Sequence, residues 1–177
     1  MTLRHIRLNS VPCTLWKNGA GTTRLLIEQP EWRLSVATIS RAAPFSSFPG
    51  LFRQMGLLTG DGVRLLPPTG ALPLLLNQPG DLLQFSGDLP LTGTPLNGSV
   101  NVLNLMRSCD RSGPNLISIT QDTLPSNILL GFMPVEGQWD VMRGGRHYTL
   151  APGDMLLDEA SFELSILKPG QIAYGIS

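Results

Sequence analysis

The sequence is poor in histidine and cysteine, and this shortage excludes the usual ways of building a metal centre or a disulfide framework. Its 177 residues include only His5, His147, Cys13 and Cys109 of these two types. Two histidines cannot supply a site that needs several imidazoles and a carboxylate. Two distant cysteines in a chain of this size usually stay reduced. We therefore expect no metal centre and no cofactor.

The sequence is also poor in charge, which argues against partners that are recognised electrostatically. Charged residues make up 15% of the chain, and thirteen basic side chains balance thirteen acidic ones. An average domain contains about 25% charged residues. A formal net charge of +0 argues against a nucleic-acid or membrane-surface partner. A weakly charged surface leaves room for a subunit interface, so a homodimer is compatible with the composition.

Long hydrophobic runs are missing as well. No apolar stretch approaches the roughly 18 residues of a membrane-spanning helix. The N-terminal residues contain no apolar core of the length found in a signal peptide. We therefore expect a cytoplasmic protein.

Glycine and proline are abundant, with 19 and 15 residues distributed along the chain. An interior proline costs a helix about 3 kcal/mol and a glycine about 1 kcal/mol, so long helices are not expected. Short alternating or β-branched runs lie between them, and in one of these Trp32, Leu34 and Val36 share a face. The predicted strands span residues 32–38, 54–58, 63–66, 82–85, 100–106, 116–120, 128–133, 138–142, 147–150, 155–157, 162–167 and 172–176. The sequence predicts an all-β protein.

One segment near the N-terminus combines an aromatic ring, a cation, an amide, glycines and hydroxyls. Its order is Trp16-Lys17-Asn18-Gly19-Ala20-Gly21-Thr22-Thr23. Glycines allow the backbone to bend close to a ligand, and Lys17, Asn18 and Thr22 offer donors to an anion or a carbonyl group. The alternative is a polar turn between two strands, because turns use the same residue types.

A short motif occurs twice. Gln78-Pro79-Gly80-Asp81 recurs as Ala151-Pro152-Gly153-Asp154, and in each case an apolar strand follows. Two such turns in corresponding places of two sets of strands favour a duplicated β-barrel lobe.

Catalytic motifs are hard to find in this chain. It contains no Gly-x-Ser-x-Gly nucleophile elbow, and neither cysteine stands in a recognised motif. An acid–base pair remains open, with His147 as the base and Asp140 or Asp154 orienting it. The alternative is that His147 is a solvated residue beside a turn.

Several motifs occur in the order that is typical of the HutD/Ves family, and the chain closely resembles that family, Ves in particular. They are Trp16-Lys17-Asn18-Gly19, the strand 32–39, Pro44-Phe45-Ser46-Ser47-Phe48-Pro49-Gly50, Arg53 and Leu57-Leu58-Thr59-Gly60-Asp61-Gly62. Phe85-Ser86-Gly87-Asp88 and Leu103-Asn104-Leu105-Met106-Arg107 fit as well. The dense matches cover residues 14–107, whereas the C-terminal third agrees mainly in strand pattern.

The resemblance implies a cytoplasmic bacterial protein with a cupin-like fold of the RmlC-like jelly-roll type. Such a bicupin has two β-barrel or sandwich lobes in one compact chain. We expect residues 1–110 to form the lobe with the ligand pocket and residues 111–177 to form a β lobe packed on it. HutD members are associated with histidine utilisation, where they resemble regulators or binding proteins for a pathway metabolite.

Three positions depart from the family pattern, which places acidic residues there. They are Leu25, Phe52 and Val102. If these positions line one site, that site has kept its cations and lost its carboxylates, and it is suited to an anion from outside. The competing interpretation is that the acids only held Arg24 or Arg53, and that the site has decayed.

We therefore expect a metal-independent protein that binds a small anionic metabolite in a regulatory or accessory role, linked to histidine utilisation or to a stress response. A metal-independent isomerase or hydrolase of small acids is the alternative, and a protein that only self-associates is a third. Phe45 and Phe48 are either packing residues or ligand contacts, and Arg33 and Ser35 join the site only if their face of the strand is the lumen. The candidate ligand-binding residues are Trp16, Lys17, Asn18, Thr22, Arg33, Ser35, Phe45, Ser46, Phe48, Arg53 and Asn104.

Overall fold

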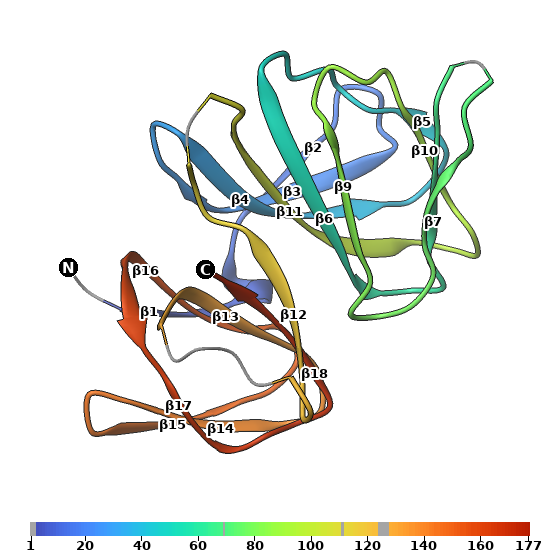
Figure 1. Ribbon diagram of the computed structural model, residues 1–177. Coiled ribbons are helices and arrows are strands. Elements are labelled where there is room, and N and C mark those ends of the chain that lie inside the picture. Colours follow the sequence, from blue (N-terminus) through green and yellow to red (C-terminus); the bar gives the residue numbers. More distant parts are fainter. Residues whose placement is uncertain (1–2, 69, 111, 124–127) are drawn as a thin grey trace. The chain divides into compact units, whose positions relative to one another are not determined.

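A computed structural model describes residues 3–68, 70–110, 112–123 and 128–177 (Figure 1). The described residues form strands joined by turns, with a single 3-10 turn at Leu8–Ser10. The all-β prediction is therefore confirmed. No helix of the described chain has the length and hydropathy needed to cross a membrane.

The chain divides into two compact units. One is Pro12–Gly113, and the other joins the residues up to Val11 with Pro114–Ser177. This differs from the expected division at residues 110 and 111, because strand β1 (Arg4–Arg7) pairs antiparallel with β16 (Asp154–Glu163). β1 is short and mostly exposed, so no apolar alternation in the sequence indicates its partner.

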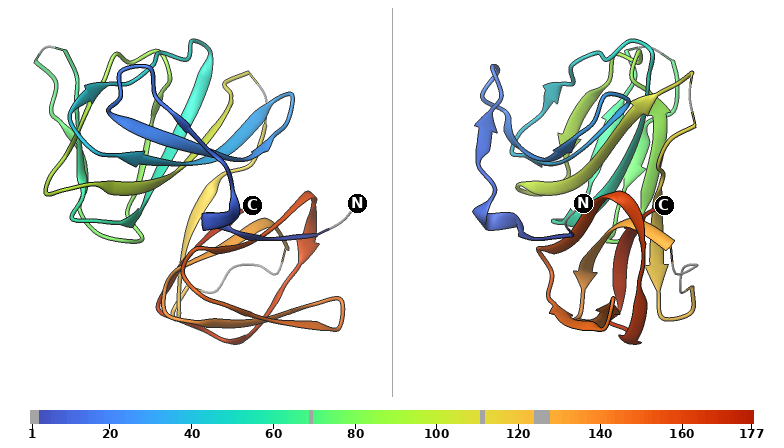
Figure 2. Two further views of the ribbon diagram at one scale, coloured as in Figure 1. Left: turned by 180° about the vertical axis from the view of Figure 1, so that it is seen from behind. Right: turned by 90° about the vertical axis from the view of Figure 1, so that its left-hand side faces the viewer.

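The unit Pro12–Gly113 contains two sheets, which are seen from three sides in Figures 1 and 2. The larger sheet has the order β2-β3-β4-β11-β6-β9 and the smaller one β5-β10-β7-β8. Their strands are β2 (Cys13–Leu15), β3 (Gly21–Glu28), β4 (Trp32–Ile39), β5 (Ala43–Pro44), β6 (Leu51–Thr59), β7 (Val63–Leu66), β8 (Leu74–Leu76), β9 (Leu82–Ser86), β10 (Thr92–Pro95) and β11 (Val100–Ser108).

Side chains from both sheets of this unit form one core. The larger sheet contributes Ile39, Leu57 and Val102, and the smaller sheet contributes Val63 and Leu65. Each of these side chains is almost fully buried. A sandwich or barrel of this kind leaves the two inner faces as the places where a cavity can form.

The second unit is built in the same way from a larger and a smaller sheet. The larger has the order β1-β16-β13-β18-β12 and the smaller β15-β14-β17. Its core includes Phe132 and Trp139, whose rings meet edge to face with centroids 5.3 Å apart. Its remaining strands are β12 (Leu116–Thr120), β13 (Ile128–Glu136), β14 (Trp139–Arg143), β15 (Arg146–Leu150), β17 (Ser165–Lys168) and β18 (Ile172–Ile176).

The repeated Pro-Gly-Asp motif forms the same turn in both units. Gly80 and Gly153 have φ values of 92° and 91°, a backbone conformation that favours glycine. The backbone N–H of Asp81 donates to the carbonyl of Gln78 at 3.1 Å, and that of Asp154 donates to the carbonyl of Ala151 at 2.9 Å. Each aspartate carboxylate also accepts a backbone N–H from the start of its turn. Each unit therefore holds one copy of the same strand-launching turn, which is compatible with a bicupin.

Candidate functional site

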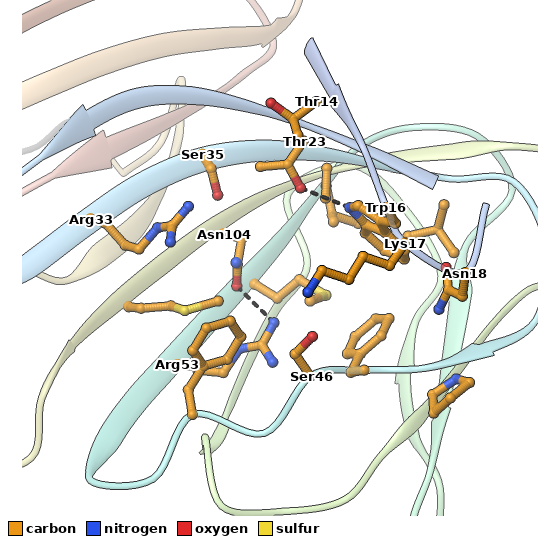
Figure 3. A pocket seen from close by; sticks show the side chains of 18 of the residues that line it. Thr14, Trp16, Lys17, Asn18, Thr23, Arg33, Ser35, Ser46, Arg53 and Asn104 are labelled. Carbon is orange, nitrogen blue, oxygen red and sulfur yellow. Dashed lines mark hydrogen bonds between the residues drawn. The ribbon is translucent and has the colours of Figure 1, made fainter. Parts of the chain in front are cut away.

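The unit Pro12–Gly113 encloses a cavity of about 500 Å³. Figure 3 shows Lys17, Arg33 and Arg53 extending into it from different parts of the fold. Its lining comprises Thr14, Leu15, Trp16, Lys17, Asn18, Thr23, Arg33, Ser35, Ala37, Ile39, Pro44, Phe45, Ser46, Phe48, Arg53, Met55, Val102, Asn104 and Met106. The volume is within the range of small-molecule sites in proteins.

Three neighbouring strands of the larger sheet provide the floor of the cavity. Asn104 on β11 lies opposite Ser35 on β4 and opposite Met55 on β6. One step along, Met106 lies opposite both Arg33 and Arg53. Because alternate residues of a strand point to the same face, these two rows project together into the cavity.

Arg53 is the central polar group of this floor. Its side chain is 6% exposed, and its Nη2 atom donates to Oδ1 of Asn104 at 3.3 Å. Its guanidinium carbon lies 5.0 Å from the ring centroid of Phe85 and 5.5 Å from those of Phe45 and Phe48. The rings attract a cation through their negative faces, but they do not neutralise its charge.

Burial, and to a smaller extent the positive charge of Arg33, lowers the pKa of Arg53 to about 10. Arg53 therefore stays charged at neutral pH. The buried Nε atoms of both Arg53 and Arg33 have no hydrogen-bond partner among the described residues. Among the described residues that line the cavity, none is an aspartate or a glutamate. A buried, uncompensated cation is unfavourable, so this floor is electrostatically suited to receive an anion.

Aromatic side chains form one wall of the cavity. Trp16 and Phe45 meet edge to face, with ring centroids 6.1 Å apart and an interplanar angle of 87°. The indole Nε1–H of Trp16 donates to Oγ1 of Thr23 at 2.8 Å, which fixes the orientation of the indole ring. Phe48 is held through its backbone N–H, which donates to the carbonyl of Gly87 at 2.8 Å.

The turn between β2 and β3 borders the cavity. The backbone N–H of Gly19 donates to the carbonyl of Trp16 at 2.9 Å, and Gly19 has a φ of 67°. Oδ1 of Asn18 accepts the N–H of Ala20 at 3.0 Å. The segment is therefore a hairpin turn, as one interpretation predicted, and the same turn presents the exposed side chains of Lys17 and Asn18 to the cavity.

Arg33 is held less firmly than Arg53. Its Nη1 atom lies 3.8 Å from Oε1 of Glu28, and the two side chains are 31% and 60% exposed. An exposed ion pair at this separation contributes little to stability. Arg33 is therefore a cation that a ligand can recruit.

The structure brings together ten of the eleven candidate residues, all except Thr22, around this cavity. Thr22 does not line it, and its neighbour Thr23 does. The reason is the alternation of β3, in which adjacent residues face opposite sides of the sheet. Arg33 and Ser35 do lie on the cavity side of β4, opposite to the face of Leu34 and Val36.

Sequence reasoning missed further lining residues, most of them apolar: Thr14, Leu15, Thr23, Ala37, Ile39, Pro44, Met55, Val102 and Met106. Period-two alternation could have found several of them. It leads from Ser35 to Ala37, from Arg53 to Met55, and from Asn104 to Val102. Thr14 and Leu15 gave no such signal, because β2 has only three residues and all are exposed.

The three positions with apolar residues in place of the family's acids lie in different surroundings. Val102 lines the cavity and is fully buried. Phe52 carries the guanidinium of Arg107 over its ring at 4.6 Å. Leu25 is 40% exposed. Of the three, only Val102 is part of the lining, so in this chain these positions do not form one site.

The acid–base pair considered from the sequence lies on the hairpin of β14 and β15. Nε2 of His147 is 3.7 Å from Oδ1 of Asp140, which also accepts a hydrogen bond from Thr149 at 2.7 Å. Asp154 instead lies 3.5 Å from His5. The His147 side chain is more than half exposed and does not line the cavity. Within the described residues, no group of three or more His, Cys, Asp and Glu is placed to hold a metal ion.

Known proteins similar to this chain include two relatives of equal identity. An uncharacterised 21.2 kDa protein in the hutC 3′ region of Pseudomonas putida is 34% identical over 117 residues, which is 62% of this chain and 60% of that protein. Protein Ves of Citrobacter koseri is 34% identical over 118 residues, with the same coverage. The match thus spans about 60% of the length of each relative. The expected closeness to Ves remains a prediction.

Solved structures with the same fold cover almost the whole chain. HutD from Pseudomonas fluorescens SBW25, in a formate condition, has a TM-score of 0.78 at 22% identity and covers 99% of this chain and 98% of its own. A cupin 2 conserved barrel domain protein from Leptotrichia buccalis has a TM-score of 0.63 at 9% identity, with 98% and 95% covered. These likenesses confirm the cupin-like fold. The family model for HutD matches residues 8–174, and because this is nearly the whole chain, the protein belongs to the HutD family.

Proposed function

We propose that this protein binds a small anionic metabolite in the cavity of the unit Pro12–Gly113 and has a regulatory or accessory role. The observation that carries the proposal is Arg53, a charged side chain that is 6% exposed, has an unpaired buried Nε atom, and lines a cavity without carboxylates. An incoming carboxylate would supply the missing counter-charge and accept the free N–H.

Two other cations, Lys17 and Arg33, would attract the anion to the cavity and provide a second contact. Lys17 lines the cavity and is exposed, so its flexible ammonium group can attract an anion from solvent. Arg33 can leave the weak 3.8 Å contact with Glu28 and turn its donors to the ligand. The apolar wall of Trp16 and Phe45 would cover the body of the ligand.

The names of two similar proteins bear on the pathway and on the choice of ligands to test. The Pseudomonas putida relative is described by its place in the hutC 3′ region, which fits the link to histidine utilisation that the motifs implied. The structure of HutD from Pseudomonas fluorescens was obtained in a formate condition, which makes formate, a small carboxylate, a reasonable first probe. We propose a link to histidine utilisation for this chain as well.

The test is thermal stabilisation followed by calorimetry with formate, acetate, urocanate, formylglutamate, histidine and sugar acids. A ligand that binds only the native state adds about 2.7 kcal/mol at 100 times its Kd, which raises the melting temperature by about 5–10 °C for a chain of this size. Arg53→Met should abolish the effect. Arg107→Met should preserve it, because Arg107 packs on Phe52 and does not line the cavity. Equal binding by wild type and Arg53→Met, or no stabilisation by any of these acids, would contradict the proposal.

A further inference from the structure

Two of the aromatic rings of the cavity wall lie directly on glycines. The ring of Trp16 lies against Gly21, where an added Cβ would be 3.1 Å from two ring carbons. The ring of Phe45 lies against Gly93 on β10, where an added Cβ would be 2.6 Å from Cζ. Gly21 and Gly93 do not line the cavity themselves.

The two glycines differ in the atoms that an added Cβ would meet. A Cβ at Gly21 would collide with the backbone carbonyl of Thr38, so glycine is needed there for the sheet itself. At Gly93 the three nearest atoms all belong to the Phe45 ring. The φ of Gly93 also lies outside the left-handed region, so the backbone conformation does not require glycine. The need for glycine at position 93 therefore comes from the ring.

The position of Gly93 determines which group would move if a side chain were added. Gly93 is paired on both sides, with Ala43 of β5 and with Leu65 of β7, so strand β10 cannot easily retreat. The Phe45 ring would have to shift by about 1 Å to reach an ordinary carbon–carbon separation. Phe45 lines the cavity and neighbours Trp16 and Arg53, so the ring would move into the space in front of the cation.

We propose that Gly93 is a specificity-determining residue that sets the upper size of the anion that can reach Arg53. This inference rests on the proposed anion binding. By leaving room for the Phe45 ring, Gly93 keeps the apolar wall far enough from the guanidinium for an anion with a bulky body. A methyl group at position 93 narrows that space without changing any charge or donor in the cavity.

The test compares acetate and benzoate, which carry the same charge and differ in size. Calorimetric titration of Gly93→Ala should give an acetate affinity within about twofold of wild type and a benzoate affinity lowered at least tenfold. The double variant Gly93→Ala/Phe45→Leu, which removes part of the ring's bulk, should restore benzoate binding. An equal loss for both acids, no loss for benzoate, or no rescue by Phe45→Leu would overturn the inference.

A crystal structure of Gly93→Ala decides the matter independently of any ligand. We expect the Phe45 ring to be displaced toward Trp16 and Arg53, with a smaller cavity. A ring that stays in place while strand β10 moves would overturn the inference. If wild type binds neither acetate nor benzoate, the proposed binding of simple carboxylates fails, and the ring position in this crystal structure still decides whether Gly93 sets the cavity width.

Discussion

Nη2 of Arg53 donates to Oδ1 of Asn104 at 3.3 Å, and this contact joins a buried charge to a buried neutral amide on the adjacent strand. An amide oxygen can accept a hydrogen bond from a guanidinium, but it cannot neutralise it. The pair therefore holds the cation in position and leaves its charge available. Replacing the amide of Asn104 by a carboxylate would instead neutralise this charge.

Asn104→Asp should weaken anion binding, because the new carboxylate would pair with Arg53 in place of the ligand. A carboxylate at this position forms a charge-assisted hydrogen bond to Arg53, whose desolvation is already part of the native state. We expect the free energy of unfolding to rise by about 1 kcal/mol and the affinity for carboxylates to fall at least tenfold. Denaturant unfolding and calorimetry measure the two quantities. The control is Asn104→Ser, which removes the amide without adding charge and should lower stability slightly while keeping anion binding. Unchanged affinity in Asn104→Asp would argue against Arg53 as the anion contact.

The pH dependence of anion binding should follow Arg53. Its pKa in the free protein is lowered to about 10 by burial and then by Arg33, and a bound anion favours the charged form and raises this pKa again. Affinity should therefore be flat between pH 6 and 9 and fall above about pH 10, by up to tenfold per pH unit. Titrations with acetate across this range measure the effect. If the affinity of Lys17→Met falls in the same pH range, the titrating group is Arg53 and not Lys17. A change of affinity centred between pH 5 and 8 would instead indicate a histidine.

The same pKa has a consequence for stability, and its sign can be worked out. The folded pKa of about 10 lies below the ordinary pKa of an arginine, so between these two pH values the unfolded chain binds more protons than the folded one. Below pH 10 the burial of charged Arg53 therefore lowers the free energy of unfolding by a constant amount. This penalty decreases only above pH 10, where the folded protein loses the proton. Arg53 should cause no variation of stability between pH 5 and 9.

Glu28→Gln should strengthen anion binding. The carboxylate of Glu28 competes for Arg33 at 3.8 Å, and its removal leaves that cation to the cavity. We expect affinity to rise about two- to fivefold at low salt, an effect that salt screens, with stability changed by less than about 0.5 kcal/mol. Glu163→Gln removes the same charge from an exposed position of β16 in the other unit and should leave affinity unchanged. Weaker binding by Glu28→Gln would show that Glu28 positions Arg33 productively.

The two copies of the Pro-Gly-Asp turn should respond equally to the loss of glycine. Gly80 and Gly153 have φ values of 92° and 91°, so alanine at either position should cost about 1–3 kcal/mol through backbone strain. The free energy of unfolding of Gly80→Ala and Gly153→Ala measures this cost. A cost at only one of the two turns would contradict their equivalence.

Much of the strand pattern could be predicted, because alternation was clear where one face is buried. Strands β4, β6 and β11 were found in this way, and they carry most of the cavity floor. Strand β3 was missed, because its register shifts between Leu25 and Ile27 and this irregularity breaks the period of two. Because the sequence does not identify β3 as a strand, it does not show which residues of this segment share a face. For this reason the sequence pointed to Thr22, whereas its neighbour Thr23 lines the cavity.

The polar part of the candidate site was easier to predict than its shape. Lys17, Arg53 and Asn104 attract attention as donors in motifs, whereas Met55 and Val102 resemble ordinary core residues. The role of Gly93 could not be read from the sequence at all. It depends on the approach of the Phe45 ring to β10, and such a contact between a loop residue and a strand is a product of tertiary packing.

The division of the chain has a consequence for the order in which the protein is made. The unit Pro12–Gly113 is continuous, so all of it is synthesised before Pro114–Ser177 of the other unit. Strand β1 emerges first, yet its partner β16 begins at Asp154. At roughly 5–20 residues per second, β1 waits on the order of ten seconds for that partner. The unit Pro12–Gly113, with its cavity, is therefore fully synthesised while strand β1 is still without its partner.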